Sequence, residues 1–330
     1  MRQPSDRPGR LGVGVISAGK VGAVLGAALR AAGHAVVGVH ASSEQSRERA
    51  GALLPDVPVL DVPTIVERSE LVLLAVPDDQ LPGLVSGLGA TGAWQPGQLV
   101  VHTAGRYGTD VLEPVRRAGG IGLAVHPAMT FTGLSLDLHR LADCSFGVTA
   151  AAPVLPIAQA LVVEMGAEPV VIAEADRPLY HAALAHGSNH VMTLLGESMQ
   201  VLGQIGVTHP ERVLGPLARA TVDNALASGE DALTGPVARG DVATVAAHVA
   251  ALRELSQDGV SAADAARSPE RVTAPDTSVP GARQTDAGEQ LLAGYRALAR
   301  QTAARAASSG RIDETTYRAV LAALDGEERP

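Results

Sequence analysis

The stretch that decides the fold runs from Leu11 to Gly33 and reads LGVGVISAGKVGAVLGAALRAAG. It begins with a short apolar run at residues 11–16 and passes through the small-residue segment SAGKVG. It then continues as an alanine- and leucine-rich segment that ends near Gly33. This order is typical of a strand, a tight turn and a helix, with which a dinucleotide-binding βαβ unit begins.

The turn fits most of the G-x-G-x-x-G fingerprint. The second glycine lets the backbone approach a pyrophosphate and the third lets the helix pack closely on the strand, and Gly19 and Gly22 occupy these two places. The first place holds Ser17, whose hydroxyl can itself donate to a phosphate. A helix beginning at Lys20 presents unpaired N–H groups and the positive end of its dipole. An ordinary strand-to-helix turn is the alternative. The pattern predicts a cofactor-binding turn made of Ser17, Ala18, Gly19, Lys20, Val21 and Gly22.

Length and composition favour a folded two-domain protein. The chain has 330 residues, of which 46% are hydrophobic and 18% charged. A net charge of -9 argues against nucleic-acid or anionic-membrane surfaces, and 2 Phe, 4 Tyr and 1 Trp make base-stacking platforms improbable. A single cysteine, Cys144, fits a reducing compartment. No signal-peptide or membrane-span pattern is present, so we expect a cytoplasmic protein with a small-molecule partner, without nucleic acid or membrane.

Apolar runs alternate with helical segments up to about residue 175. Runs typical of buried strands lie at residues 11–16, 35–39, 57–60, 71–76, 98–102, 122–126, 144–149 and 169–173. Helical patterns lie between several of them, at 43–53, 107–118 and 153–165. Strands alternating with helices predict a doubly wound parallel sheet covered on both faces. We therefore expect an α/β, Rossmann-type domain at 11–175, preceded by a disordered stretch at 1–10.

Beyond residue 176 the pattern becomes helical throughout. Apolar residues at helical spacing extend over 177–205, 209–228, 241–255, 291–307 and 313–324. Between them, residues 256–289 are polar and rich in charge, proline and glycine, which indicates a mobile insertion. The sequence thus predicts an all-α domain at 176–330 that binds substrate and forms the centre of a homodimer.

In an open parallel sheet, ligands bind at the carboxyl ends of the strands. After residue 39 come hydroxyls and an arginine instead of the acid that NAD-preferring sites use, so Ser42, Ser43 and Arg47 are expected to hold a 2′-phosphate and the cofactor is expected to be NADP. A solvated helix face carrying Arg47 and Arg49 is the alternative. Further along this edge we expect the cofactor to meet Val76, Pro77, Thr103 and Gly105.

Three histidines are candidates for chemistry. His102 and His126 each end a strand at the ligand edge, where they can donate to a substrate or bond to neighbouring backbone. His181 lies on the long helix with Ser188 on the same stripe and Asn189 beside it, and such polar groups on a mostly apolar helix are costly unless bonded or facing a cleft. No metal constellation stands out, since the histidines are not paired with carboxylates at ligand spacing.

Together, several motifs resemble one family. These are GVISAGKVGAVLGAAL, LLAVPDDQL, VVHTAG, LAVHPAMTF, LAHGSNHVMTLLGE and PLARATVDNALASGEDALTGPVARGDVATVAAH. They resemble bacterial proteins in which a Rossmann-like domain precedes the domain of unknown function 2520, over residues 11–324 without the insertion. The resemblance implies an NADP-binding domain and a helical domain like that of 6-phosphogluconate dehydrogenase. More distantly the chain is similar to pyrroline-5-carboxylate reductase and ketopantoate reductase, and its His126-Pro127-Ala128-Met129 segment to the His-Pro-Met segment of prephenate dehydrogenases.

The resemblance carries over incompletely at the long helix. Ketopantoate reductases and hydroxyacid dehydrogenases place a lysine one turn before an asparagine; Asn189 matches the asparagine, but Ala185 stands where the lysine would be. Pyrroline-5-carboxylate reductases also lack the lysine, and their Ser-Gly-Ser-Gly-Pro segment resembles residues 186–190. Their glycine- and threonine-rich loop has a counterpart at residues 233–236.

These observations predict an NADP-dependent oxidoreductase. Hydride would pass between the nicotinamide and a carbonyl or imine carbon of a small, carboxylate-bearing substrate in a cleft between the domains. His126, His181, or a water held by Asn189, would transfer the proton. The rival interpretation is a non-catalytic NADPH-binding sensor, which the missing lysine and Ser17 both favour.

Overall fold

The computed structural model describes residues 10–265 and 284–326, and the chain divides into two compact units, Met1–Val191 and Met192–Pro330. The division falls within the long helix α8 (Arg177–Gln204). The domain boundary near residue 175 stays a prediction. The amino-terminal stretch expected to be disordered lies outside the described residues, apart from Arg10.

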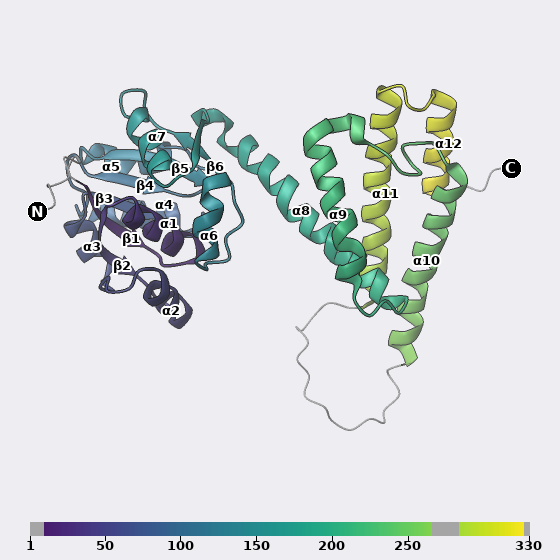
Figure 1. Ribbon diagram of the computed structural model, residues 1–330, viewed down its shortest axis with the longest axis horizontal. Coiled ribbons are helices and arrows are strands. Elements are labelled where there is room, and N and C mark those ends of the chain that lie inside the picture. The colour runs from purple at the N-terminus through teal and green to yellow at the C-terminus, as the bar shows by residue number, and fades with distance from the viewer. Residues whose placement is uncertain (1–9, 266–283, 327–330) are drawn as a thin grey trace, which may run out of the picture. The chain divides into compact units, whose positions relative to one another are not determined.

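The first unit is built on a seven-stranded sheet with the order β2-β1-β3-β4-β5-β6-β7 (Figure 1). Its strands are β1 (Gly12–Ile16), β2 (Ala35–His40), β3 (Leu71–Leu74), β4 (Leu99–His102), β5 (Ile121–Pro127), β6 (Ser145–Thr149) and β7 (Glu168–Val171). β1 lies between β2 and β3, so the strand order reverses beside β1, where this class of sheet opens its ligand crevice. The sheet confirms the predicted Rossmann-type α/β fold.

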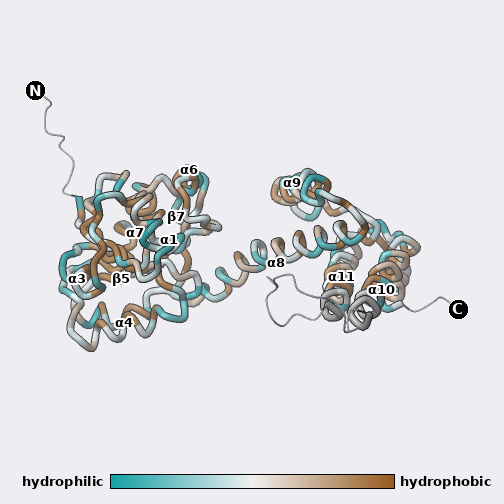
Figure 2. The backbone as a smooth tube through the Cα atoms, turned by 90° about the horizontal axis from the view of Figure 1, so that it is seen from below, coloured by the Kyte–Doolittle hydropathy of each residue, from teal (hydrophilic) through white to brown (hydrophobic). Residues whose placement is uncertain are grey.

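Helices cover both faces of this sheet. They are α1 (Lys20–Ala31), α2 (Glu44–Leu53), α3 (Val62–Arg68), α4 (Leu81–Ala90), α5 (Glu113–Arg117), α6 (Leu136–Arg140) and α7 (Leu155–Glu164). Successive residues of one strand enter different cores: Leu71 and Leu73 pack into one, Val72 and Leu74 into the other. Because the side chains of a strand alternate between faces, both faces are buried, and Figure 2 shows the hydrophobic colour gathered around β5 in the interior of this unit.

The sheet is mostly parallel, and β6 is the strand that departs from the predicted parallel arrangement. This strand pairs antiparallel with β5, with His126 opposite Gly147, whereas β7 is parallel to β6. The reason is the connection at residues 128–144, which returns the chain into β6 at the same edge at which β5 ends. That connection therefore lies at the carboxyl end of β5, where ligands bind in such sheets.

One expected strand is absent, and helix α3 was not anticipated. Residues 57–60 contribute only an isolated bridge between Val39 and Val59. Helix α3 follows directly, with the Asp61 side chain accepting a hydrogen bond from the backbone N–H of Thr64 at 2.8 Å. A side-chain cap of this kind and a proline in the first turn both favour the start of a helix at this point.

The second unit is helical, as predicted. Beyond the end of α8 it contains α9 (Pro210–Ser228), α10 (Val242–Ala265), α11 (Gln284–Ser308) and α12 (Glu314–Asp325). Its core joins α10, α11 and α12 through Val245, Leu292, Ala303 and Val320. The ends of the insertion expected at 256–289 are helical in α10 and α11, and its middle lies outside the described residues. Within residues 10–265 and 284–326, no helix has both the length and the apolar character needed to span a bilayer.

Candidate active site

The turn between β1 and α1 has the geometry of a phosphate-binding turn. Ser17 adopts φ 79°, the positive value that the first glycine of the fingerprint ordinarily supplies. A Cβ at Gly19 would meet only the Ser17 hydroxyl, at 3.6 Å, whereas a Cβ at Gly22 would collide with the Ser17 carbonyl. Gly19 therefore leaves the backbone open and Gly22 allows the helix to pack closely. Gly19 also caps α1 without a side-chain hydrogen bond, so no side-chain cap competes with an anion there.

The connection after β5 reaches this turn. Gly133 has φ 82°, and a Cβ there would lie 3.2 Å from the Cα of Lys20 and 2.8 Å from Cδ of Arg49. The buried Asp137 carboxylate holds the connection by accepting hydrogen bonds from the Thr132 and Gly133 amides, both at 2.8 Å. Burial alone would raise the pKa of Asp137, but these hydrogen bonds outweigh it and lower the pKa. The carboxylate is therefore ionised and fixes the connection against the amino end of α1.

The residues after β2 divide between capping and exposure. Ser43 caps α2, with its hydroxyl accepting from the Ser46 amide at 3.1 Å. Ser42 is exposed, and Arg47 is held beside it by a hydrogen bond to the Ser42 carbonyl at 3.3 Å. Arg49 instead donates to the carbonyl of Ala18 at 3.4 Å. A solvated helix face was the alternative interpretation for Arg49, but in the structure this arginine contacts the phosphate turn.

His102 has a structural role. It is fully buried; its Nε2 lies 2.8 Å from the Gly108 carbonyl, and its Nδ1 accepts from the Ala104 amide at 3.2 Å. Burial lowers its pKa to about 4. Both ring nitrogens of His102 are engaged with backbone. Of the two roles expected from the sequence, donating to a substrate or bonding to neighbouring backbone, His102 therefore has the second.

Beyond His102, the backbone brings Gly105 against two of the candidate catalytic residues. A Cβ at Gly105 would collide with the His181 ring and would lie 3.0 Å from Nε2 of His126. The rings of His126 and His181 are 5.7 Å apart between centroids, at 79° to each other. Only a glycine permits this approach. The structure therefore gathers Gly105, His126 and His181 at the carboxyl ends of β4 and β5.

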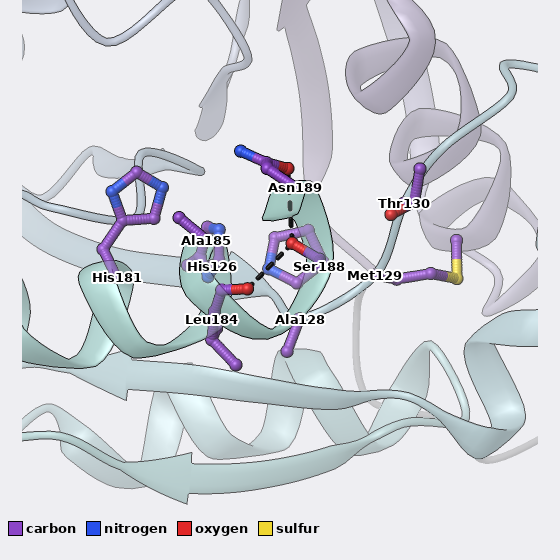
Figure 3. A pocket seen from close by; sticks show the side chains of 10 residues that line it. His126, Ala128, Met129, Thr130, His181, Leu184, Ala185, Ser188 and Asn189 are labelled. Atoms are coloured by element: carbon purple, nitrogen blue, oxygen red, sulfur yellow. Dashed lines mark hydrogen bonds between the residues drawn. The ribbon is translucent and has the colours of Figure 1, made fainter. Parts of the chain in front are cut away.

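A pocket of about 220 Å³ lies between the end of β5 and one face of α8 (Figure 3). The Ser188 hydroxyl lies 2.8 Å from the Leu184 carbonyl oxygen and 3.3 Å from Oδ1 of Asn189, as the dashed lines show. All three candidate catalytic residues therefore share one cavity, whose lining is His126, Pro127, Ala128, Met129, Thr130, His181, Leu184, Ala185, Ser188 and Asn189. Among the described residues, no group of three or more His, Cys, Asp or Glu side chains is arranged to hold a metal ion.

Two residues beside the pocket were not predicted from the sequence. The hydroxyl of Tyr180 lies 3.0 Å from Nδ1 of His126. The fully buried Arg177 donates to Thr149 Oγ1 at 2.7 Å and to the carbonyls of Ala124 and Gly147 at 3.0 and 2.9 Å. The one sequence feature that could have indicated Arg177 and Tyr180 is that both lie within one helical turn of His181. An arginine is rarely buried, so the sequence favours an exposed position for Arg177.

His126 is kept uncharged by its surroundings. Burial lowers its pKa to about 4, and the nearby His181, Arg177 and His102 act in the same direction. At neutral pH its imidazole is therefore neutral, with one nitrogen that donates and one that accepts.

Comparison with known proteins agrees with this architecture. The family model of a Rossmann-like domain matches residues 1–127, and that of a domain of unknown function, DUF2520, matches residues 144–263. The two models together show a Rossmann-like domain followed by a DUF2520 domain, the order that the sequence motifs predicted. No curated protein matches the sequence.

Several solved structures share the fold. A Bacteroides fragilis protein provisionally named an NADP oxidoreductase is 20% identical, with a TM-score of 0.63 over 76% of this chain and 93% of that one. An imine reductase from Pseudomonas sp. is 17% identical, with a TM-score of 0.53 over 92% and 100% of the two chains. A Plasmodium falciparum pyrroline carboxylate reductase with NADP bound is 11% identical, with a TM-score of 0.51 over 94% and 100%. At these identities the likeness establishes the fold.

Proposed function

We propose that this protein is an NADP-dependent oxidoreductase that transfers hydride between the nicotinamide and a carbonyl or imine carbon of a small, carboxylate-bearing molecule. The observation that carries the proposal is the convergence of His126, His181 and Asn189 on one pocket beside Gly105. This pocket lies at the sheet edge where Rossmann-type folds bind dinucleotides. The names of the structural neighbours, which include an NADP oxidoreductase and two reductases, support the same class of reaction.

The phosphate turn fits a dinucleotide. The open backbone at Gly19 and the amino end of α1 suit a diphosphate, and Arg49 brings a positive charge to the same turn. Arg47 and the Ser42 hydroxyl are exposed after β2, where they can meet a 2′-phosphate. Thr103 and Gly105 follow β4 on the way to the pocket. The cofactor, when bound, supplies the hydride donor or acceptor.

Within the pocket, the chain's own residues would orient the substrate and move a proton. His126 is neutral at pH 7 and offers one N–H donor. His181 lies beside it and is the second candidate for the proton. Asn189 lines the same cavity, where its amide can hold a substrate oxygen or a water.

A non-catalytic NADPH-binding sensor is the second candidate. Ala185 lines the pocket at the place where related dehydrogenases carry a lysine, so the wall of α8 lacks the usual proton donor. This observation favours a protein that binds the dinucleotide and signals its presence.

One experiment separates these functions and tests the cofactor. A panel of 2-oxo acids and cyclic imines is assayed with purified protein by NADPH absorbance, and the affinities for NADPH and NADH are measured by fluorescence. We expect turnover with at least one compound and NADPH binding at least about tenfold tighter than NADH, a difference of roughly 1.4 kcal/mol.

The Arg47→Ala variant should lose this preference, while Arg116→Ala, on the remote helix α5, should keep it. Equal affinities for the two dinucleotides would contradict the 2′-phosphate site. Tight NADPH binding without turnover across the panel would support the sensor.

A further inference from the structure

The first turn of α8 brings three side chains to His126. Arg177, Tyr180 and His181 lie at positions i, i+3 and i+4, which share one face of a helix. Arg177 fixes this turn to the sheet through the carbonyls of Ala124 on β5 and Gly147 on β6. Tyr180 and His181 consequently meet the His126 ring from two directions, at centroid distances of 5.6 and 5.7 Å.

The contact between Tyr180 and His126 requires a glycine on the neighbouring strand. Gly147 is paired with His126 across β5 and β6, and a Cβ there would lie 2.6 Å from the Tyr180 hydroxyl oxygen. The missing side chain makes room for the phenol directly beside Nδ1 of His126. The position of the hydroxyl is therefore set by backbone on one side and by the imidazole on the other.

The direction of this hydrogen bond follows from the surroundings of the phenol. Burial raises the pKa of Tyr180, with smaller opposing effects from Arg177 and from a hydrogen bond with the Gly147 backbone, so the phenol is protonated at neutral pH. Among the described residues, the one hydrogen-bond acceptor within reach of the phenol is Nδ1 of His126, at 3.0 Å. The phenol proton of this half-buried side chain is therefore satisfied when it is donated to Nδ1.

We propose that Tyr180 is a positioning residue that holds His126 with its proton on Nε2, so that the pocket presents a neutral N–H donor and selects substrates carrying a carboxylate or carbonyl oxygen. Nε2 faces Gly105, which is one of the residues expected to meet the cofactor. The inferred selection of substrates, the substrate half of this inference, rests on the proposed function. The inferred position of the proton on His126, the tautomer half, is a property of the free protein.

The opposite tautomer would give the opposite selectivity. With its proton on Nδ1, His126 would donate to Tyr180, and Nε2 would become an acceptor suited to ammonium or protonated imine groups. The hydrogen-bonding partner on one nitrogen thus sets what the other nitrogen recognises.

The test reads the tautomer directly. Nitrogen-15 NMR of histidine-labelled protein at pH 7.5, without cofactor, distinguishes protonated from unprotonated ring nitrogens. We expect His126 to carry its proton on Nε2, and Tyr180→Phe to convert this into a mixture of tautomers. A proton on Nδ1 in the wild-type protein overturns the proposal, whether or not the protein proves to be an enzyme.

The chain offers a matched control. Tyr295 makes the same contact in the second unit, with its hydroxyl 2.9 Å from Nδ1 of His248. Tyr295→Phe removes an equivalent hydroxyl from a partly buried tyrosine of the second unit and should leave the His126 signals unchanged. A change of the His126 tautomer in this control as large as in Tyr180→Phe would overturn the assignment to Tyr180.

Small probes test the selectivity. Oxalate supplies carboxylate oxygens and ethylenediamine supplies ammonium groups, and both are small enough for the pocket. Oxalate should shift the His126 Nε2 signal and ethylenediamine should not, and Tyr180→Phe should weaken oxalate binding about two- to tenfold, the effect of losing one orienting hydrogen bond. Preferential binding of ethylenediamine, or no response to oxalate, overturns the substrate half.

Repeating the Tyr180→Phe substitution in a His126→Gln variant shows whether its effect on binding depends on His126 or on a general loss of structure. The amide nitrogen of glutamine can replace the Nε2 donor and has no tautomers, so Tyr180→Phe should not alter oxalate binding in a His126→Gln protein. The same loss in both backgrounds would assign Tyr180 a structural role and overturn the proposal. A failed search for NADPH turnover, with the expected tautomer observed, would contradict the proposed function alone.

Discussion

Ser17 has a backbone conformation that a side chain disfavours, with φ 79°. In the described part of the chain, only Ser17 and Asp56 adopt positive φ without being glycine. Replacing Ser17 by glycine should relieve this strain and raise the free energy of unfolding by about 0.5–1 kcal/mol in urea titrations. Ser42→Gly, a serine outside this conformation, should give no such gain. Stability that is unchanged or lower in Ser17→Gly would mean that the hydroxyl compensates for the strain.

The pH dependence of stability should reveal His102. Its pKa is 6.5 when unfolded and about 4 in the fold, where burial disfavours the charged ring. The unfolded chain binds more protons between these values, so stability is full above pH 6.5 and is lost as the pH falls towards 4. We expect His102 to account for roughly 2–3 kcal/mol of loss between pH 7.5 and 4.5.

Urea unfolding of wild type and His102→Gln at both pH values measures this contribution, since the carboxylates titrate in both proteins. The variant should lose less stability on acidification. His209→Gln, at an exposed position, should behave as wild type does. Equal losses in wild type and His102→Gln would contradict the assignment.

Residue by residue, the sequence predicted the parts of the site that depend on short spacing. The turn at 17–22 can be recognised because its residues are contiguous. His126 and His181 were each nominated, but their meeting depends on a glycine at position 105, and no local pattern connects these three positions. Arg177 was missed because an arginine without a carboxylate partner is not expected in a protein interior.

At the level of elements, α8 decides whether Asn189 is catalytic. Asn189 lies on α8 and lines the pocket. The one buried side chain of α8 is that of Arg177. Asn189→Ala should therefore lower turnover by roughly 10²-fold or more, with NADPH affinity and melting temperature nearly unchanged. Kinetics, dinucleotide titration and thermal unfolding measure the three quantities.

The alternative is that Asn189 braces a contact of the helix. The same substitution would then cost about 1–3 kcal/mol of stability, with normal turnover per folded molecule. Asn189→Asp serves as a matched variant, because it keeps the shape and removes the amide donor. A loss of stability with normal turnover in Asn189→Ala would remove Asn189 from the catalytic residues and weaken the case for His181.

The reversal of β6 shows what sequence patterns leave open at this scale. An apolar run of five residues looks the same in a parallel and in an antiparallel strand. The direction of β6 depends on whether residues 128–144 cross the sheet or return along its edge. Tertiary contacts decide this, such as the close approach of Gly133 to Lys20 and Arg49. The helices of the second unit were predictable because their periodicity is long and regular.

For the whole molecule, the exposed apolar residues of α8 and α9 favour a homodimer. Leu179, Met192, Leu217 and Leu226 are 74%, 73%, 65% and 82% exposed, and α9 buries none of its residues. We infer that a second copy of the chain covers these helices. Light scattering at micromolar concentration should give the mass of a dimer.

A charge on this surface should dissociate the dimer. Leu217→Glu should shift the mass towards that of a monomer, whereas Val163→Glu, at a similarly exposed apolar residue of α7, should leave it unchanged. A monomeric wild-type protein at micromolar concentration would refute the interpretation.

The hydrogen bonds that Asp137 accepts provide a way to detect a bound dinucleotide. The amides of Thr132 and Gly133 are tied to one carboxylate, and Gly133 touches the residue that begins α1. Deuterium uptake at these two amides is therefore sensitive to whatever occupies the phosphate turn. It offers a readout of dinucleotide occupancy that needs no turnover and applies equally to an enzyme and to a sensor.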